Sequence, residues 1–326
     1  MAYNRVIARS DAAALIPEEV SREIVQGVAE TSACLRLFRR LPNMSRKQQR
    51  VPVLSALPTA YFVNGDTGFK QTTEQAWENK YLNAEEIACI VPIPEAVLDD
   101  ADYDIWAEVR PRIVEAFGVV IDAAILFGTN KPASWPASIL YGATRAGHVV
   151  ALGTGADIYD DIMGENGVIS LVEEDGYMVN GHIAAMTMKA KLRGLRDTNG
   201  QPIFVRSMQD RTRYELDGEP MEFPANGAFD VTKALMFSGD FRQAVYAMRQ
   251  EITYKVLTEA VIQDDTGAIV YNLAQQDMVA LRAVMRLAWQ VPNPVTRLQP
   301  TEAQRYPFAV LTPAAAGNTG GGQAPA

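Results

Sequence analysis

Two long extended segments joined by a turn-rich stretch constrain this chain more than any other feature of its sequence. The segments span residues 50–63 and 75–93, and NGDTGFKQTTE at residues 64–74 connects them. At ~3.3 Å per residue, each arm can reach roughly 45–60 Å. The distal part of the second arm, residues 78–86, is mostly polar and cannot build a core. Because a two-stranded hairpin is marginally stable alone in water, we expect another subunit to hold it.

The base of the second arm leads into an acidic corner. Residues 87–91 read IACIV, which is apolar at consecutive positions and predicts burial on both faces. Asp99 and Asp100 then mark a corner between strand and helix, where we expect turn and capping chemistry. Asp102 or Asp104 is the expected N-cap of the helix that follows.

A long helix is predicted over residues 103–128. Apolar residues recur along it at spacings of three and four, and they are Trp106, Val109, Ile113, Phe117, Val120, Ala124 and Phe127. Pro111 lies inside this pattern and removes a backbone donor, which predicts a kink or a local break. Gly128 is expected to end the helix.

A long strand is predicted over residues 278–291. Every second residue on one face is apolar, namely Val279, Leu281, Ala283, Met285, Leu287, Trp289 and Val291. The opposite face carries Arg282, Arg286 and Gln290, so the strand should be half-buried.

Shorter patterns occupy the rest of the chain. Pro17-Glu18-Glu19 opens an amphipathic helical pattern, and its apolar stripe is Val20, Ile24, Val25 and Val28. The other predicted elements are a strand and a helix within 183–195, a turn between short strands at 214–224, a buried strand at 234–237 and a closing strand at 308–311.

Composition narrows the classes of function. The net charge of −9 argues against a surface that neutralises phosphates, and therefore against direct nucleic-acid recognition. No apolar run approaches the ~20 residues that a membrane helix needs. Cys34 and Cys89 have no partner spacing and are expected to be free, buried small hydrophobes. A disulfide between them is the alternative. His148 and His182 lack neighbours at ligand spacing, so we interpret both as structural or surface residues.

No motif for catalysis or cofactor binding stands out. The chain has neither a phosphate-binding loop of the form GxxxxGK[ST] nor a GxSxG nucleophile elbow. We therefore predict no catalytic residue, no cofactor and no metal, and the chain does not look like an enzyme.

The order of five motifs resembles a known family. They are PIPEAVLDDADYDIW (92–106), DAAILFGTNKP (122–132), LDGEPM (216–221), LMFSGDFRQAVYAMR (235–249) and DMVALRAVMRLAWQVPNP (277–294). Together with the hairpin, they resemble the tailed-phage major capsid protein of the HK97-type fold, from about residue 15 to 312. The resemblance implies an α+β fold with the following parts: an N-terminal arm (1–45), an extended hairpin loop (46–91), a peripheral domain with a spine helix (92–134), an axial domain (135–272), a long strand of the peripheral domain (273–300), a closing strand of the axial domain (301–312) and a flexible tail (313–326).

The same resemblance implies a function and partners. The chain would assemble with itself as hexamers and pentamers into an icosahedral shell that encloses double-stranded DNA without reading its sequence. A separate scaffolding protein and a portal are expected partners, and a decoration protein is a further candidate. The location would be the virion capsid, assembled in the cytoplasm of a host bacterium, with no membrane association.

Some members of that family cross-link through a lysine at the hairpin tip, and Lys70 matches this position. The asparagine acceptor and the helper glutamate of those members correspond to Asp277 and Val284 here. A carboxylate is a poorer acceptor than an amide, and valine cannot move protons. We therefore expect Lys70 to be a charged interface or solvent residue without an isopeptide bond.

Arg282 and Arg286 lie four residues apart in a predicted strand, so both should point the same way. Their candidate carboxylate partners are Glu78, Glu85, Glu86, Asp99, Asp100 and Asp102. One hypothesis pairs them across subunit contacts. The alternative leaves them solvated or paired within one subunit.

Two other interpretations compete with the phage shell. An encapsulin-like nanocompartment would share the fold but enclose enzyme cargo, docked in an inner apolar groove near the N-terminal helix. A soluble oligomeric α+β enzyme would form a small oligomer instead of a megadalton shell. Packaged double-stranded DNA in purified particles would distinguish the phage shell from the nanocompartment. Particle mass would distinguish a megadalton shell from a small oligomeric enzyme.

Overall fold

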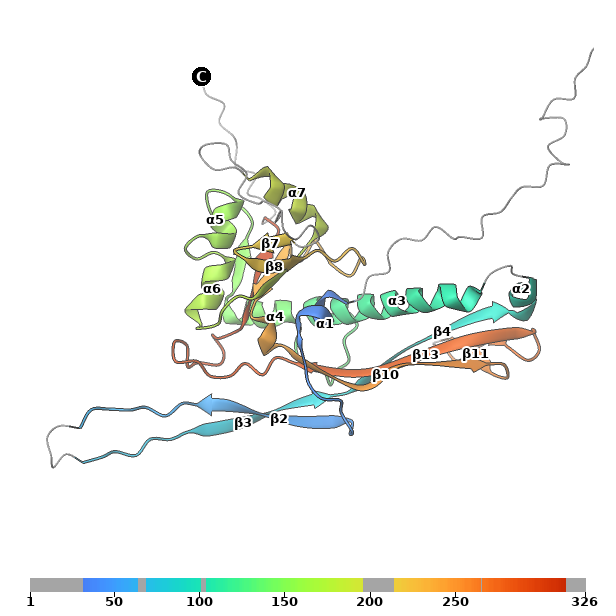
Figure 1. The fold of residues 1–326 in the computed structure, drawn as a ribbon, viewed down its shortest axis with the longest axis horizontal. Coiled ribbons are helices and arrows are strands. Elements are labelled where there is room, and N and C mark those ends of the chain that lie inside the picture. The colour runs from blue at the N-terminus through green and yellow to red at the C-terminus, as the bar shows by residue number, and fades with distance from the viewer. Residues whose placement is uncertain (1–31, 64–68, 101–103, 196–213, 265, 315–326) are drawn as a thin grey trace, which may run out of the picture.

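The computed structural model describes residues 32–63, 69–100, 104–195, 214–264 and 266–314. Three parts stand out in Figure 1: a lobe built around one sheet, an elongated body in which a long helix lies along a second sheet, and a projecting hairpin. The predicted apolar stripe before residue 32, Asp102 and most of the predicted tail lie outside the described residues. Within those residues, no helix combines the length and apolarity needed to cross a membrane.

The elongated body is built on a four-stranded sheet with the order β1-β10-β13-β4. Its strands are β1 (Arg39–Arg40), β10 (Val245–Leu257), β13 (Met278–Gln290) and β4 (Glu85–Pro94). The predicted long strand is therefore present as β13, and it pairs antiparallel with both neighbours. Strand β10 was not predicted. Its residues fall in the range 135–272 that the sequence assigned to the axial domain, yet they pair with β13 along its length.

The predicted long helix is present as α3 (Ile105–Phe127), and the sequence located its ends well. Asp104 is the N-cap and accepts hydrogen bonds from the backbone N–H groups of Trp106 and Ala107 at 3.0 and 3.2 Å. Gly128 ends the helix in the left-handed conformation, with φ 74°. The predicted break at Pro111 is absent, because helix α3 continues through that residue. Pro111 and Ala107 are both exposed, so water can satisfy the carbonyl that loses its donor.

The core of the body lies between α3 and one face of β13. Ile113, Phe117 and Ile121 of the helix belong to the same buried cluster as Leu281 and Trp289 of the strand. Each such side chain contributes about 1.5–3 kcal/mol when it is fully buried. The cluster thus holds the helix along the sheet.

The second face of β13 is more buried than predicted. Ala280, Val284 and Ala288 alternate with the polar residues and are all less than 10% exposed. Ala288 packs with Leu82 and Met44, which come from the base of the hairpin and the segment before it. The expectation of a half-buried strand was therefore wrong, because a segment distant in sequence crosses over this face.

Strand β4 is less buried than predicted. It is an edge strand, and its residues alternate between half-buried and exposed along the IACIV segment. Ile90 is 43% exposed in the single chain. The expectation of burial on both faces was wrong for an isolated subunit, because only one face of this edge meets the core.

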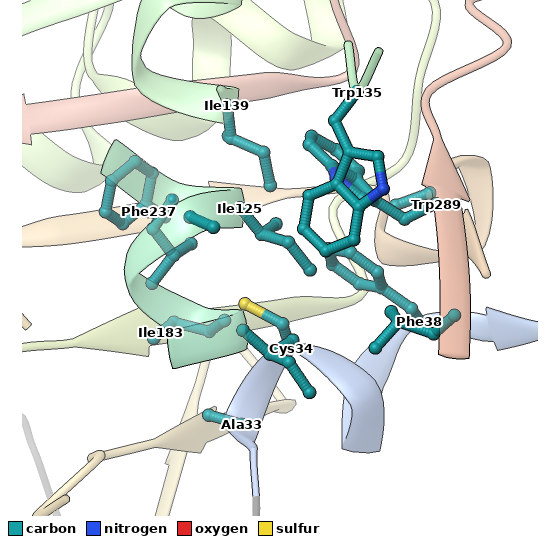
Figure 2. Packing of buried hydrophobic residues seen from close by; sticks show 14 of the residues in the cluster. Ala33, Cys34, Phe38, Ile125, Trp135, Ile139, Ile183, Phe237 and Trp289 are labelled. Carbon is teal, nitrogen blue, oxygen red and sulfur yellow. The ribbon is translucent and has the colours of Figure 1, made fainter. Parts of the chain in front are cut away.

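A short N-terminal helix, α1 (Ala33–Leu37), is fastened to α3 by a buried carboxylate. Asp122 is fully buried and accepts hydrogen bonds from the Ser32 hydroxyl at 2.5 Å and the Ala33 N–H at 3.0 Å. It also accepts from the Cys34 N–H and the Asn226 side-chain amide, both at 3.1 Å. Figure 2 shows Cys34 directed into the core shared by the two helices. Burial, followed by the nearby Asp122 charge, raises the pKa of the Cys34 thiol well above its ordinary value.

The lobe contains a six-stranded sheet with the order β5-β14-β9-β6-β8-β7. Its strands are β5 (Val149–Ala151), β14 (Phe308–Thr312), β9 (Met236–Gly239), β6 (Gly181–Ala184), β8 (Glu219–Glu222) and β7 (Tyr214–Leu216), and its helices are α4 (Ile139–Ala146), α5 (Ile158–Met163), α6 (Val168–Glu174) and α7 (Met186–Gly194). The strand and helix predicted within 183–195, the turn at 214–224 and the closing strand are all confirmed.

Three further small elements belong to the described residues. A 3-10 turn at Phe241–Gln243 precedes β10, and β11 (Val261–Gln263) pairs with β12 (Ile269–Asn272) as a separate two-stranded sheet. Both cysteines are free, and only Cys34 is fully buried. Both histidines are buried, and burial lowers the pKa of His182 to about 4.

Replacing Asp122 should remove the hydrogen bonds that attach α1 to α3. The variant Asp122→Ala leaves a hydroxyl, two backbone N–H groups and an amide without their acceptor, and we expect the free energy of unfolding to fall by about 3 kcal/mol. Urea unfolding followed by circular dichroism measures this change. The exposed Asp99→Ala is the matched control and should change stability by less than about 0.5 kcal/mol. Equal stability of the two variants would contradict the assignment.

Candidate functional site: the projecting hairpin and its support

The projecting hairpin consists of β2 (Gln48–Ala56) and β3 (Ala76–Asn83). Among the described strands, these two pair only with each other, from Gln48↔Asn83 to Ala56↔Ala76. The predicted second arm is therefore two strands and not one, because Ala84 separates β3 from β4, and residues 85–91 join the four-stranded sheet. The range 46–91 that the sequence assigned to the hairpin loop ends too late by this part of β4.

Large apolar side chains lie uncovered along the hairpin and at its end. Phe62 is fully exposed, and Phe69 is 94% exposed. Trp77 on β3 is 65% exposed, and Tyr61 and Tyr81 are each exposed by at least 40%. Exposed apolar groups gathered on one projecting element mark an interaction surface. These aromatic residues were not predicted to form a contact surface, although Tyr61 and Phe62 lie just before the turn-rich stretch and Phe69 lies within it.

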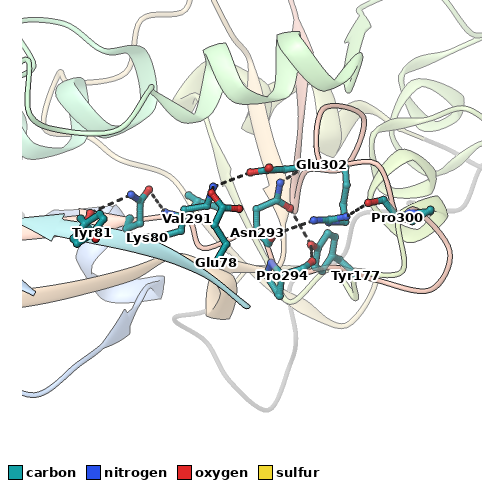
Figure 3. Close-up of polar contacts among 11 residues, drawn as sticks. Glu78, Lys80, Tyr81, Tyr177, Val291, Asn293, Pro294, Pro300 and Glu302 are labelled. Carbon is teal, nitrogen blue, oxygen red and sulfur yellow. Dashed lines mark hydrogen bonds and ion pairs between the residues drawn. The ribbon is translucent and has the colours of Figure 1, made fainter. Parts of the chain in front are cut away.

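A loop from the body holds the base of the hairpin. We call residues 291–305, between β13 and β14, the support loop. The Val295 N–H donates to the carbonyl of Leu54 at 3.0 Å, and the Arg297 side chain donates to the carbonyl of Pro58 at 3.0 Å. The Lys80 ammonium group contacts the Glu302 carboxylate at 2.8 Å (Figure 3). The support loop thus makes polar contacts with both arms of the hairpin.

Lys80 lies between two carboxylates. Its Nζ atom is also 3.3 Å from the Glu78 carboxylate, and its side chain is 23% exposed. Burial by itself would lower the pKa of Lys80, but the hydrogen bonds and charges of Glu302 and then Glu78 outweigh it and raise that pKa. The hydrogen bond from Lys80 is also the main reason that the pKa of Glu302 is lowered. Both charges are therefore maintained at neutral pH.

The support loop is itself fixed by a buried arginine. Arg305 is 3% exposed and donates to the carbonyls of Gln299, Pro300 and Asn293 at 2.8, 3.1 and 3.1 Å. The Tyr177 hydroxyl donates within the same region, at 3.0 Å from the Asn293 side-chain oxygen and 2.9 Å from the Pro294 carbonyl. Burial raises the pKa of Tyr177 to about 12. The support loop that contacts the hairpin is therefore held in place by these hydrogen bonds.

Arg286 pairs inside its own subunit. It stands opposite Glu86 in the β13–β4 register, and its Nε atom donates to the Glu86 carboxylate at 2.7 Å. This contact corresponds to the alternative in which the arginine pairs within one subunit, and pairing across subunits stays a prediction. Arg282 is exposed beside Ile90 and Lys255, and it makes no ion pair with any described residue.

The remaining predicted contact residues lie in three separate parts of the fold. Glu85 accepts a hydrogen bond from the Ser134 hydroxyl at 2.6 Å within the same chain. Asp99 and Asp100 are exposed at the end of a short helix, α2 (Glu95–Asp100), where a simple turn was expected. Lys70 is exposed near the outer end of the hairpin. Among the described residues, no three His, Cys, Asp or Glu side chains form a group that could hold a metal.

Comparison with known proteins identifies the class. Residues 12–296 match the model of the phage capsid family, so the chain belongs to this family. The chain is 28% identical over 279 residues to the major capsid protein of Staphylococcus phage 80alpha, covering 84% of this chain and 81% of that protein. It is 23% identical over 266 residues to a probable major capsid protein of Mycobacterium phage D29, covering 80% and 82%.

Solved structures support the same conclusion. A chain from Microbacterium phage Oxtober96 is 38% identical with a TM-score of 0.81, covering 95% of this chain and 100% of that chain. A chain from Mycobacterium phage Bobi is 32% identical with a TM-score of 0.80, covering 95% and 100%. The fold is the HK97-type α+β capsid fold, as the sequence motifs predicted.

Reversing one charge of the Arg286–Glu86 ion pair tests whether the two residues pair within one subunit. The variant Arg286→Glu places two carboxylates opposite each other, and we expect the isolated subunit to lose about 1 kcal/mol of stability. The double variant Arg286→Glu/Glu86→Arg should recover most of that loss in the same subunit. Arg282→Glu, which breaks no described pair, is the control. Failure of the double variant to recover stability in unassembled subunits would place the partner of Arg286 on another chain.

Proposed function

We propose that this chain is the major capsid protein of a tailed phage, assembled as hexamers and pentamers into an icosahedral shell around double-stranded DNA. The hairpin carries the proposal. Its base is held by its own support loop, whereas Phe62, Phe69 and Trp77 remain exposed. Leaving such side chains in water forfeits about 1.5–3 kcal/mol each. A neighbouring copy of the chain supplies the apolar surface that covers them.

The parts of the fold have separate places in this shell. The six-stranded lobe forms the axial domain around the capsomer centre, and α3 with the four-stranded sheet forms the peripheral domain. Strand β10 belongs to the peripheral domain in this scheme, because its partner is β13. Residues 1–45 act as the N-terminal arm, and residues 313–326 form the tail.

The partners follow from the role of a shell subunit. Besides copies of itself, we propose a portal and a separate scaffolding protein as partners, with a decoration protein as a further candidate. Assembly takes place in the cytoplasm of the host bacterium, and the finished location is the virion. The named relatives come from phages, which favours this role over a cargo compartment or an enzyme. We propose no catalytic activity.

Removing the aromatic groups should block assembly without unfolding the subunit. We expect Phe62→Ser/Phe69→Ser to reduce the yield of shells at least tenfold, because each serine removes most of the apolar area that the contact buries. Electron microscopy and sedimentation measure the yield, and circular dichroism verifies the fold. Thr72→Ala, also on the hairpin, is the control and should assemble normally. Normal shells from the double variant would refute the role of the hairpin.

Mature particles should contain no covalent links through Lys70. Val284, at the position of the helper glutamate, is 8% exposed and has no group that transfers protons. Asp277 offers a carboxylate immediately before β13. Particles heated in denaturant should therefore release chains of 35.7 kDa on a gel. A ladder of higher masses that disappears in Lys70→Ala particles would show that the cross-link forms.

A further inference from the structure

A buried histidine and a buried aspartate meet where the lobe joins the support loop. His148 lies directly before β5 and Asp175 directly after α6, and each is less than 10% exposed. The Nε2 atom of His148 is 3.3 Å from the Asp175 carboxylate. Its Nδ1 atom is 3.3 Å from the carbonyl oxygen of Phe308 in β14. Both ring nitrogens therefore face oxygen atoms.

These two contacts set the number of protons that the pair must hold. A neutral imidazole has one N–H group, and its other nitrogen carries a lone pair. The Phe308 carbonyl only accepts hydrogen bonds, so Nδ1 of His148 must carry a proton. The contact between Nε2 and Asp175 then needs a second proton, located on the ring or on the carboxyl group. With one proton fewer, two lone pairs would face each other.

A pair with two protons is neutral as a whole. It is an imidazolium beside a carboxylate, or a neutral ring beside a carboxyl group, and the two protons belong to the pair. Removing one of them leaves a net negative charge on His148 and Asp175. Because water is largely excluded from this position, that charge is costly. Burial therefore favours the state with two protons.

The groups around the aspartate agree with this count. Burial has the largest effect on the Asp175 carboxyl group and raises its pKa. The hydrogen bond from the Tyr306 N–H and the positive charge of Arg305 act in the opposite direction without cancelling the rise, and the Glu174 charge adds to it. Tyr177 is also close, and burial raises its pKa to about 12, so it stays neutral.

The same aspartate attaches the support loop to the lobe. Its carboxylate accepts the N–H of Tyr306, the residue that follows the support loop, at 2.7 Å. Its carbonyl accepts the Thr296 hydroxyl from within that loop at 2.6 Å. Gly176 follows with φ 83°, and a Cβ atom there would lie 3.3 Å from the Leu298 side chain. The lobe and the support loop are thus in close contact at Asp175.

We infer that the two protons of the His148–Asp175 pair hold the support loop on the lobe, and that this attachment weakens as the pH rises above neutrality. When the junction opens and the pair meets water, the aspartate is ionised and the histidine loses its proton above about pH 6.5. The open pair then holds one proton, whereas the closed pair holds two. Opening releases a proton, so a higher pH favours the open junction.

This inference goes beyond the proposed function, because it concerns protons within one chain and holds for an unassembled subunit. The support loop also holds the base of the hairpin through Arg297 and Glu302. The protons of a buried pair in the lobe therefore affect an element that projects from the other side of the support loop.

Nuclear magnetic resonance of the unaltered protein tests the proton count. The chain has two histidines, so full-length unassembled subunits labelled with 15N-histidine give four ring-nitrogen signals. Through-bond correlations assign each ring to its residue. At pH 7 we expect Nδ1 of His148 to carry a proton. Burial lowers the pKa of His182 to about 4, so its neutral ring is the internal reference. An unprotonated Nδ1 on His148 would overturn the inference.

Hydrogen exchange tests the effect on the junction. The protection factor of the Tyr306 amide, which removes the intrinsic effect of pH on exchange, should fall about fivefold from pH 7 to pH 8. The amide of Ile121 in the core of α3 should show no such fall. In His148→Gln the fall at Tyr306 should disappear, because glutamine does not titrate. Glu174→Gln removes a neighbouring charge but leaves the pair, so it is the matched control and should keep the fall.

Two results of this exchange experiment would refute the inference. One is equal protection of the Tyr306 amide at pH 7 and pH 8 in the unaltered protein. The other is an undiminished fall in His148→Gln. The measurements on the unaltered protein need no substitution, so they remain decisive even where the variant fails to fold.

Discussion

The buried carboxylate of Asp122 fixes the point at which the N-terminal part of the chain joins the body. It satisfies the first N–H groups of α1 and the Ser32 hydroxyl, and it also bonds Asn226 from the lobe. A buried charge is costly unless hydrogen bonds replace its hydration, and here four donors do so. One side chain of the long helix therefore joins three segments that are distant in sequence. A groove that Ser32 lines depends on this junction.

The chain divides into parts that are complete alone and parts that require a partner. Helix α3 and β13 bury each other, and the hairpin base covers the second face of β13 through Leu82 and Ala288. In contrast, the outer hairpin exposes Phe62 and Phe69, and the edge strand β4 exposes Ile90. Folding and assembly thus use different apolar surfaces. The exposed apolar groups lie on a projecting hairpin and on an edge strand, away from the core that α3 and β13 share.

The sequence predicted what depends on local periodicity and missed what depends on distant segments. The spacing of three and four along α3, its Asp104 cap and Gly128 were all readable, because each signal lies within the element. Strand β10 was missed because Arg249, Gln250 and Glu251 interrupt its apolar pattern. The burial of Val284 and Ala288 could not be foreseen, since the residues that cover this face come from a crossing that no local pattern encodes. For the same reason, the pairing of Arg286 with Glu86 was left open. Two residues 200 positions apart become neighbours only through the β13–β4 register.

The support loop attaches the base of the hairpin to the body of its own subunit. The Arg297 hydrogen bond and the Lys80–Glu302 ion pair hold the hairpin near the body. Phe62 and Phe69 lie beyond the last of these contacts. The Thr296 hydroxyl donates a hydrogen bond to the carbonyl of Asp175 in the lobe at 2.6 Å, so the support loop is joined to the lobe as well as to the sheet. A rotation of the lobe would therefore be transmitted through the support loop to the hairpin. Subunits with identical sequences can in this way set different angles to their neighbours, which is what a closed surface of changing curvature demands.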